Sequence, residues 1–181
     1  MTAPYSPDEL SGEGKTAYKE KRYAEAADAF QAASQGYMAA GDPLSAAEML
    51  NNQSVSLLMA GNAEMALQAA SGTEETFAAA GDIRRQAMAF GNQGAALEKL
   101  ARFDEAIGAY EHANELFKQI GEHDLRKIVL ESLSTLQMKT GRKYEAAATL
   151  KASMDEDQQP KPVRRFLKKL YDLSFKALFR S

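Results

Sequence analysis

Three groups of residues have types and spacings that could support chemistry. The first, Gly14-Lys15-Thr16, has the ending of a phosphate-binding loop, in which backbone N–H groups and a lysine hold the phosphates of a nucleotide. That motif also needs a glycine five residues before Gly14, where this chain has Glu9, and a strand before the loop, which the sequence does not predict. The sequence therefore does not predict a nucleotide site.

The other two groups are the histidines and an acidic run. His112 and His123 lie eleven residues apart on different predicted elements, without carboxylates at a supporting spacing, so we expect surface histidines rather than a metal site or a general base. Residues 155–157, Asp-Glu-Asp, could attract a cation, but we expect a solvated linker there. No nucleophile is paired with a base. We expect no catalytic residue, no metal and no cofactor, and hence no enzyme.

Composition narrows the classes of protein further. The 181 residues are 45% hydrophobic and include no cysteine, which excludes disulfides and thiolate metal sites. No stretch approaches the roughly 20 apolar residues that span a bilayer. The first ten residues lack the basic start and apolar core of a signal peptide, so we expect a soluble, cytoplasmic protein.

A 40-residue repeat organises the elements that would position any site. Its clearest copy, residues 101–113, has an aromatic residue, then alanine, an aromatic and alanine at spacings of three, four and three. The four copies are Tyr23, Ala26, Phe30 and Ala33; Ala63, Ala66, Ala70 and Thr73; Phe103, Ala106, Tyr110 and Ala113; and Lys143, Ala146, Leu150 and Ser153. Gly41-Asp42, Gly81-Asp82 and Gly121-Glu122 mark the junctions. A constant period of this size indicates a solenoid of repeated helical hairpins.

On these residues the sequence resembles the tetratricopeptide repeat (TPR) family over about residues 7–154. Gly14 and Gly94 match the small-residue position of the first helix, where Ser54 and Ser134 replace glycine. The alanine of the second helix is present in all four copies, whereas Ala70 and Leu150 depart from its aromatic position. The 40-residue step is similar to the longer repeats of kinesin light chains and Pins-type spindle-orientation scaffolds.

The predicted fold is all-α: a right-handed α-solenoid of four TPR helical hairpins plus a C-terminal amphipathic helix. We expect a lead-in at 1–6, hairpins at about 7–41, 42–81, 82–121 and 122–154, an acidic, proline-bearing linker at 155–162 and a basic helix at 163–181. In the second hairpin, the second helix is expected to continue to about Ala80.

The resemblance implies a concave groove lined by the first helix of each hairpin, which binds a partner peptide or helix. In the long variants an asparagine two residues before the small-residue position bonds the peptide backbone, and this chain has Asn52 and Asn92 there. The alternative is that both are solvated or bond a neighbouring helix. The groove candidates are Asn52, Asn92, Val55, Met59, Lys99 and Lys139.

A related subclass clamps a C-terminal carboxylate with lysine, arginine and asparagine. At its five positions this chain has Ser11, Lys15, Asn52, Met88 and Asn92, and of these only Asn52 fits. We therefore do not predict a carboxylate clamp.

The C-terminal segment has the opposite charge to the rest. Residues 1–160 have a net charge of −9 and residues 161–181 a net charge of +6. One face of the predicted helix is apolar, and the other carries Arg164, Arg165, Lys168, Lys169, Lys176 and Arg180. The segment could cap the solenoid, bind an anionic membrane or acidic partner, or pair with a second copy to give a homo-oligomer. A single basic helix attached to an acidic solenoid does not indicate that the protein binds nucleic acid.

These observations give two hypotheses for function. The first is a non-catalytic protein–protein interaction adaptor, and the alternative is a peripheral membrane-surface protein localised through the basic helix.

Overall fold

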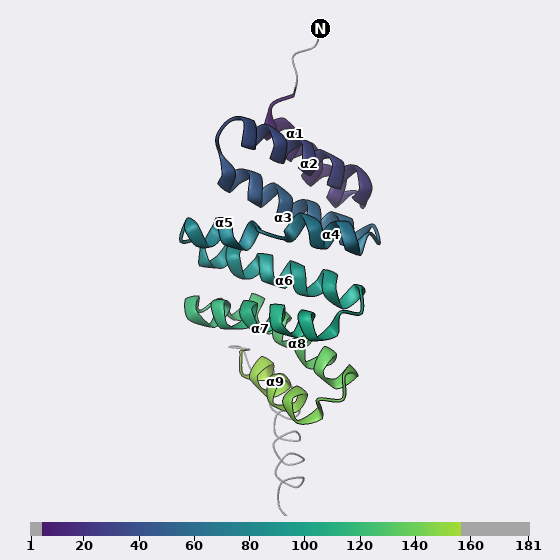
Figure 1. The fold of residues 1–181 in the computed structure, drawn as a ribbon, viewed down its shortest axis with the longest axis vertical. Coiled ribbons are helices and arrows are strands. Elements are labelled where there is room, and N and C mark those ends of the chain that lie inside the picture. Colours follow the sequence, from purple (N-terminus) through teal and green to yellow (C-terminus); the bar gives the residue numbers. More distant parts are fainter. Residues whose placement is uncertain (1–4, 157–181) are drawn as a thin grey trace, which may run out of the picture.

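The computed structural model describes residues 5–156, and within this range the chain consists of helices joined by short turns (Figure 1). The predicted helix at 163–181 and most of the linker before it lie outside the described residues. The helices are α1 (Pro7–Lys19), α2 (Tyr23–Ala39), α3 (Pro43–Met59), α4 (Ala63–Ala70), α5 (Thr73–Ala79), α6 (Ile83–Lys99), α7 (Phe103–Ile120), α8 (His123–Lys139) and α9 (Lys143–Asp155).

The helices stack in chain order along the long axis, so the molecule is an all-α solenoid (Figure 1). Successive helices pack against each other as antiparallel hairpins: α1 with α2, α3 with α4 and α5, α6 with α7, and α8 with α9. A repeat structure of this kind is stabilised mainly by contacts between neighbouring units.

Local sequence fixes where the helices begin and end. Ser6 and Glu9 form a capping box at the start of α1, and the side chain of Asp82 accepts a hydrogen bond from the Arg85 N–H at the start of α6. Gly41 and Gly81, at φ of 76° and 71°, take the left-handed conformation that ends a helix at little cost for glycine.

The small-residue positions of the repeat allow close contact within a hairpin. A Cβ added to Gly14 would lie 2.8 Å from the Phe30 ring, and one added to Gly94 would lie 2.8 Å from the Tyr110 ring. The alanines of the second helices, Ala26, Ala66 and Ala106, are fully buried. The repeat pattern therefore encodes the places where two helices touch.

The second hairpin differs from the prediction, because its second helix is broken into α4 and α5 at Ser71-Gly72. Gly72 has a φ of 81°, so the chain turns and restarts. The Ala70 carbonyl accepts hydrogen bonds from the Thr73 hydroxyl at 2.7 Å and the Gln93 Nε2 at 3.2 Å. The expectation of one continuous helix to Ala80 was wrong.

The acidic run after α9 also differs from the prediction at Glu156. The Glu156 carboxylate lies 2.7 Å from the His123 Nδ1 and forms an ion pair with Arg126, both on α8, and its side chain is 9% exposed. This residue is therefore not part of a solvated linker, and His123 does have a carboxylate partner. The contacts fix the point at which the chain leaves α9.

Candidate partner-binding site

Two similar pockets lie where the first helices of successive hairpins face each other. The N-terminal pocket, between α1 and α3, has a volume of about 280 Å³. Phe30 of α2 contributes to its lining, and Asn52 and Val55 line it from α3. Lys15, Tyr18 and Lys19 of α1 complete the lining, so the pocket combines apolar surface with positive charge.

The C-terminal pocket, between α6 and α8, has a similar volume of about 270 Å³. Tyr110 of α7 occupies the repeat position of Phe30 in both the chain and the pocket. Asn92 has the repeat position of Asn52 along the chain but lies on the opposite wall, on α6, and Ser132 of α8 stands where Asn52 stands in the N-terminal pocket. The other lining residues are mostly apolar: Met88, Gly91, Ala95, Phe117, Leu125, Ile128, Val129 and Ser132.

The two asparagines have unused hydrogen-bonding groups. Both are half-buried, and within residues 5–156 neither side-chain amide has a hydrogen-bond partner. The Ser56 hydroxyl does bond Asn52, but at its backbone oxygen. Each amide therefore offers one acceptor and two donors at the wall of an apolar pocket.

Tyr110 gives the C-terminal pocket a buried polar atom as well as an aromatic surface. Its hydroxyl donates to the Glu98 carboxylate at 3.2 Å. Burial, followed by the nearby charge of Glu98, raises the pKa of Tyr110 well above its usual range. The phenol is therefore a neutral hydrogen-bonding group at physiological pH.

The remaining groove candidates lie elsewhere. Met59, Lys99 and Lys139 are the last residues of α3, α6 and α8, and all three are exposed. The Lys139 ammonium lies 4.4 Å from the centre of the Phe103 ring, so part of its interaction capacity is used within the protein. The structure thus brings Asn52 and Val55 together in one pocket and places Asn92 in the other.

The sequence analysis did not predict most of the residues on the pocket wall that faces each asparagine. Tyr18, Lys19 and Ile128 come from the neighbouring first helix, and single-helix periodicity does not show which residues face across a junction. The repeat frame did contain a signal for Ile128, because it lies 40 residues after Met88.

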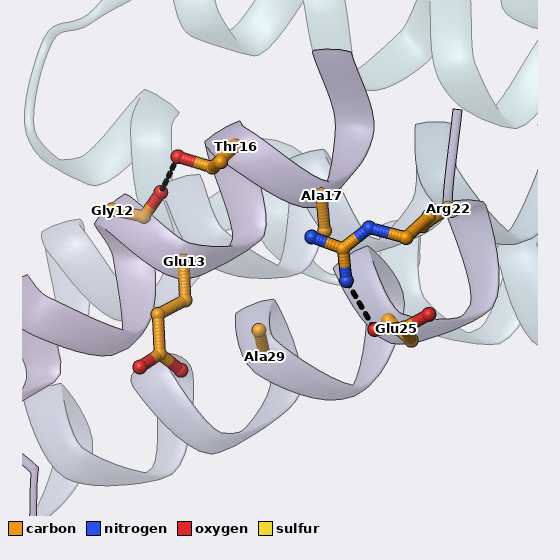
Figure 2. Close-up of a pocket in the computed structure, with 7 residues that line it drawn as sticks. All are labelled: Gly12, Glu13, Thr16, Ala17, Arg22, Glu25 and Ala29. Carbon is orange, nitrogen blue, oxygen red and sulfur yellow. Dashed lines mark hydrogen bonds and ion pairs between the residues drawn. The ribbon is translucent and has the colours of Figure 1, made fainter. Parts of the chain in front are cut away.

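A third cavity, of about 490 Å³, lies between α1 and α2 (Figure 2). Its cation, Arg22, bonds both Glu20 and Glu25, which neutralise it. The Thr16 hydroxyl donates to the Gly12 carbonyl at 3.0 Å, within α1. Thr16 and the rest of the Gly14-Lys15-Thr16 triplet therefore lie inside a helix and not in a phosphate-binding loop.

Residues 5–156 contain neither a metal-binding cluster nor a membrane-spanning helix. No group of three or more acidic or histidine side chains there could hold a metal ion. None of the helices in that range has the length and apolar content needed to cross a membrane.

Comparison with known families identifies the repeat. The family model of the soluble NSF attachment protein, SNAP, matches residues 9–162. The chain belongs to the SNAP family. A solved structure described as kinesin light chain TPR-like repeats, from Podospora anserina, supports the TPR-type architecture of this SNAP-family chain. It aligns with a TM-score of 0.54 at 11% identity, covering 98% of this chain and 100% of the other. No curated protein matches the chain significantly.

These findings confirm the predicted TPR-type repeat and all-α solenoid. At 11% identity the structural likeness concerns the fold alone.

Proposed function

We propose that the protein is a non-catalytic adaptor that binds an extended segment of a partner protein along α3 and α6. The observation that carries this proposal is the pair of amides without a side-chain partner in residues 5–156, Asn52 and Asn92, which occupy the same repeat position on α3 and α6 and each line a pocket of similar size. An amide can bond both the N–H and the C=O of an extended peptide, which leaves the peptide's side chains to fill the pockets.

The pockets indicate what the partner segment contains. The C-terminal pocket takes an apolar side chain, since Met88, Ile128 and Phe117 line it. The N-terminal pocket takes an apolar side chain next to an acidic one, because Lys15 and Lys19 stand beside Phe30 and Val55. Family membership supports an adaptor role, since the family's name describes attachment of another protein.

The test is peptide selection followed by measured affinities. Peptides selected from a random library on the full chain are titrated against Asn52→Ala, Asn92→Ala and the control Asn62→Ala. Asn62 is exposed, and its side chain makes no capping bond at the start of α4. Losing one or two hydrogen bonds of about 1 kcal/mol each raises Kd about tenfold.

The result expected is that Asn52→Ala and Asn92→Ala each weaken binding, while Asn62→Ala does not. Selected peptides that bind all three variants with equal affinity would place the partner site elsewhere. Thermal melts of the variants serve as the folding control, because substitutions of this type at half-exposed sites change stability by less than about 0.5 kcal/mol.

A second candidate function rests on the charge of residues 161–181, a net +6 attached to an acidic body. A basic amphipathic helix could hold the adaptor on an anionic membrane, with each basic residue contributing about 1 kcal/mol. Sedimentation with phosphatidylserine vesicles distinguishes the two candidates. Co-sedimentation of the full chain that is lost at high salt supports membrane attachment, and no co-sedimentation at low salt contradicts it.

A further inference from the structure

A further pocket, of about 470 Å³, is lined by the second helices of the last two hairpins, α7 and α9, and by α8. We call it the α7–α9 pocket, and its polar lining residues are Glu111, Asn114, Glu115, Arg126, Gln137 and Thr149. It shares no residue with the C-terminal pocket, which takes other residues from α8. The two pockets therefore lie on different sides of α8.

Two positions of the repeat change from apolar to polar at the α7–α9 pocket. In the three earlier hairpins the position of Gln137 holds buried apolar residues: Ala17, Leu57 and Leu97. The position of Thr149 holds alanine in those hairpins: Ala29, Ala69 and Ala109. Packing between the helices of a hairpin therefore does not require a polar residue at either position, and the change needs another cause.

Gln137 is buried with an unused acceptor. The residue is 3% exposed, and within residues 5–156 no group donates a hydrogen bond to its Oε1. An acceptor buried without a donor loses the bonds that it makes to water in the unfolded chain, so it lowers stability. The last torsion of a glutamine side chain is soft, and the amide can turn its oxygen toward a donor that enters the pocket.

The charges around the pocket favour a positively charged donor. Glu111 and Glu115 lie one turn apart on α7, and both are exposed. Arg126 is the only cation among the described lining residues, and it forms an ion pair with Glu156 and donates to Asn114 at 2.9 Å. Within residues 5–156, the lining charges that no ion pair balances are therefore two carboxylates.

We propose that the α7–α9 pocket is a second partner site, which takes an arginine side chain from a basic segment of another protein. A guanidinium carries five N–H donors in one plane, enough to bond the Gln137 oxygen and a carboxylate of the rim together. Its methylene groups pack on Leu130 and Leu133, which line the pocket and are 2% and 3% exposed. This proposal does not rest on the groove of α3 and α6, and if both sites bind, the protein joins two partner segments.

Titration of the full chain with N-acetylarginine amide, followed by nuclear magnetic resonance, tests the site. N-acetylcitrulline amide is the matched probe, because its side chain has the same length and no charge. Gln137→Leu installs the residue of the second and third hairpins, so this variant should fold and should unfold at a higher urea concentration than the wild type. Glu111→Gln removes one rim charge, and Glu64→Gln is its control, since Glu64 is exposed and does not line the pocket.

The arginine probe should shift the side-chain amide signals of Gln137 saturably, with a Kd of about 1 mM or weaker for a single side chain. The citrulline probe should bind at least about fivefold more weakly, because it lacks the charge that the carboxylates attract. Gln137→Leu and Glu111→Gln should each raise the Kd of the arginine probe at least about fivefold, followed through the backbone signal of Thr149. Glu64→Gln should leave this Kd unchanged.

Three results would overturn the proposal. The first is an equal Kd for the two probes, and the second is a Kd that neither Gln137→Leu nor Glu111→Gln changes. The third concerns the chain's own basic segment, which is the competing occupant. If a full chain with glutamine at the six basic residues of the predicted C-terminal helix bound the arginine probe at least about tenfold more tightly, that segment and not a partner would fill the pocket.

Discussion

At two positions of the described residues, a glycine of a first helix lies so close to an aromatic ring of the second helix that a side chain there would collide with it. Gly94 faces Tyr110, and a methyl group there would lie 2.8 Å from the ring. Gly94→Ala should therefore lower the free energy of unfolding by about 1–3 kcal/mol, measured by urea denaturation. Gly108 is the matched control, because it is also helical and has open space around its Cβ position.

Gly108→Ala should instead raise the free energy of unfolding, by about 0.5–1 kcal/mol, since alanine is the better helix former. Equal effects of the two substitutions would show that contact with Tyr110 does not determine the residue at position 94.

The Asp82 cap of α6 makes a contribution to the free energy of unfolding that depends on pH. The hydrogen bond from the Arg85 N–H, with the nearby Arg85 guanidinium, lowers the pKa of Asp82 below its usual value of 3.8. A lowered folded-state pKa stabilises the protein above the unfolded value, and this stabilisation is lost as pH falls through the folded value. Asp82→Asn keeps the cap but not the charge.

We therefore expect Asp82→Asn to cost about 0.3–1 kcal/mol at pH 7 and to approach wild-type stability near pH 2. Asp28→Asn, at an exposed position without a partner in residues 5–156, controls for the loss of one negative charge. If the difference in stability between Asp82→Asn and the wild type stayed constant from pH 7 to pH 2, the charge of Asp82 would not be its cause.

At the scale of elements, the break between α4 and α5 is held by a residue of the next hairpin. Gln93 on α6 donates to the Ala70 carbonyl and to the Glu74 carboxylate, at 3.2 and 2.6 Å. Gln93→Met keeps the side-chain length but leaves both acceptors with one partner fewer. It should destabilise the protein by about 1–2 kcal/mol in urea denaturation.

The control is Gln119→Met, which changes an exposed glutamine of α7 and should have an effect below about 0.5 kcal/mol. If the two variants unfold at the same urea concentration, the break is stabilised by Gly72 and Thr73 alone.

The hairpins and the α4–α5 break also show which features of the fold could be predicted from the sequence and which could not. The repeat frame identified the hairpins and Asn52, because spacing and residue type along one helix carry that information. The α4–α5 break was missed, since Gly72 is a single glycine in an otherwise helical pattern and its partner Gln93 lies 21 residues away. Glu156 was missed for the same reason, because its partners lie at least 30 residues earlier.

For the whole molecule, the stability of substituted full chains tests the hypothesis that the predicted C-terminal helix caps the solenoid. A cap would bury Leu170 and Leu173, so on this hypothesis Leu170→Asp with Leu173→Asp should lower stability by about 2–4 kcal/mol, because both leucines become charged. Lys168→Asp with Lys176→Asp is the matched control on the basic face. If both double variants melt at the wild-type temperature, the segment does not support the solenoid.

The adaptor account is tested most directly by nuclear magnetic resonance of the asparagine side chains during titration with a selected peptide. The account predicts that the side-chain amide signals of Asn52 and Asn92 shift together with one shared Kd, as each bonds the peptide backbone, while Asn62 stays unchanged. Saturable binding that leaves the Asn52 and Asn92 signals where they are in the free protein would contradict it.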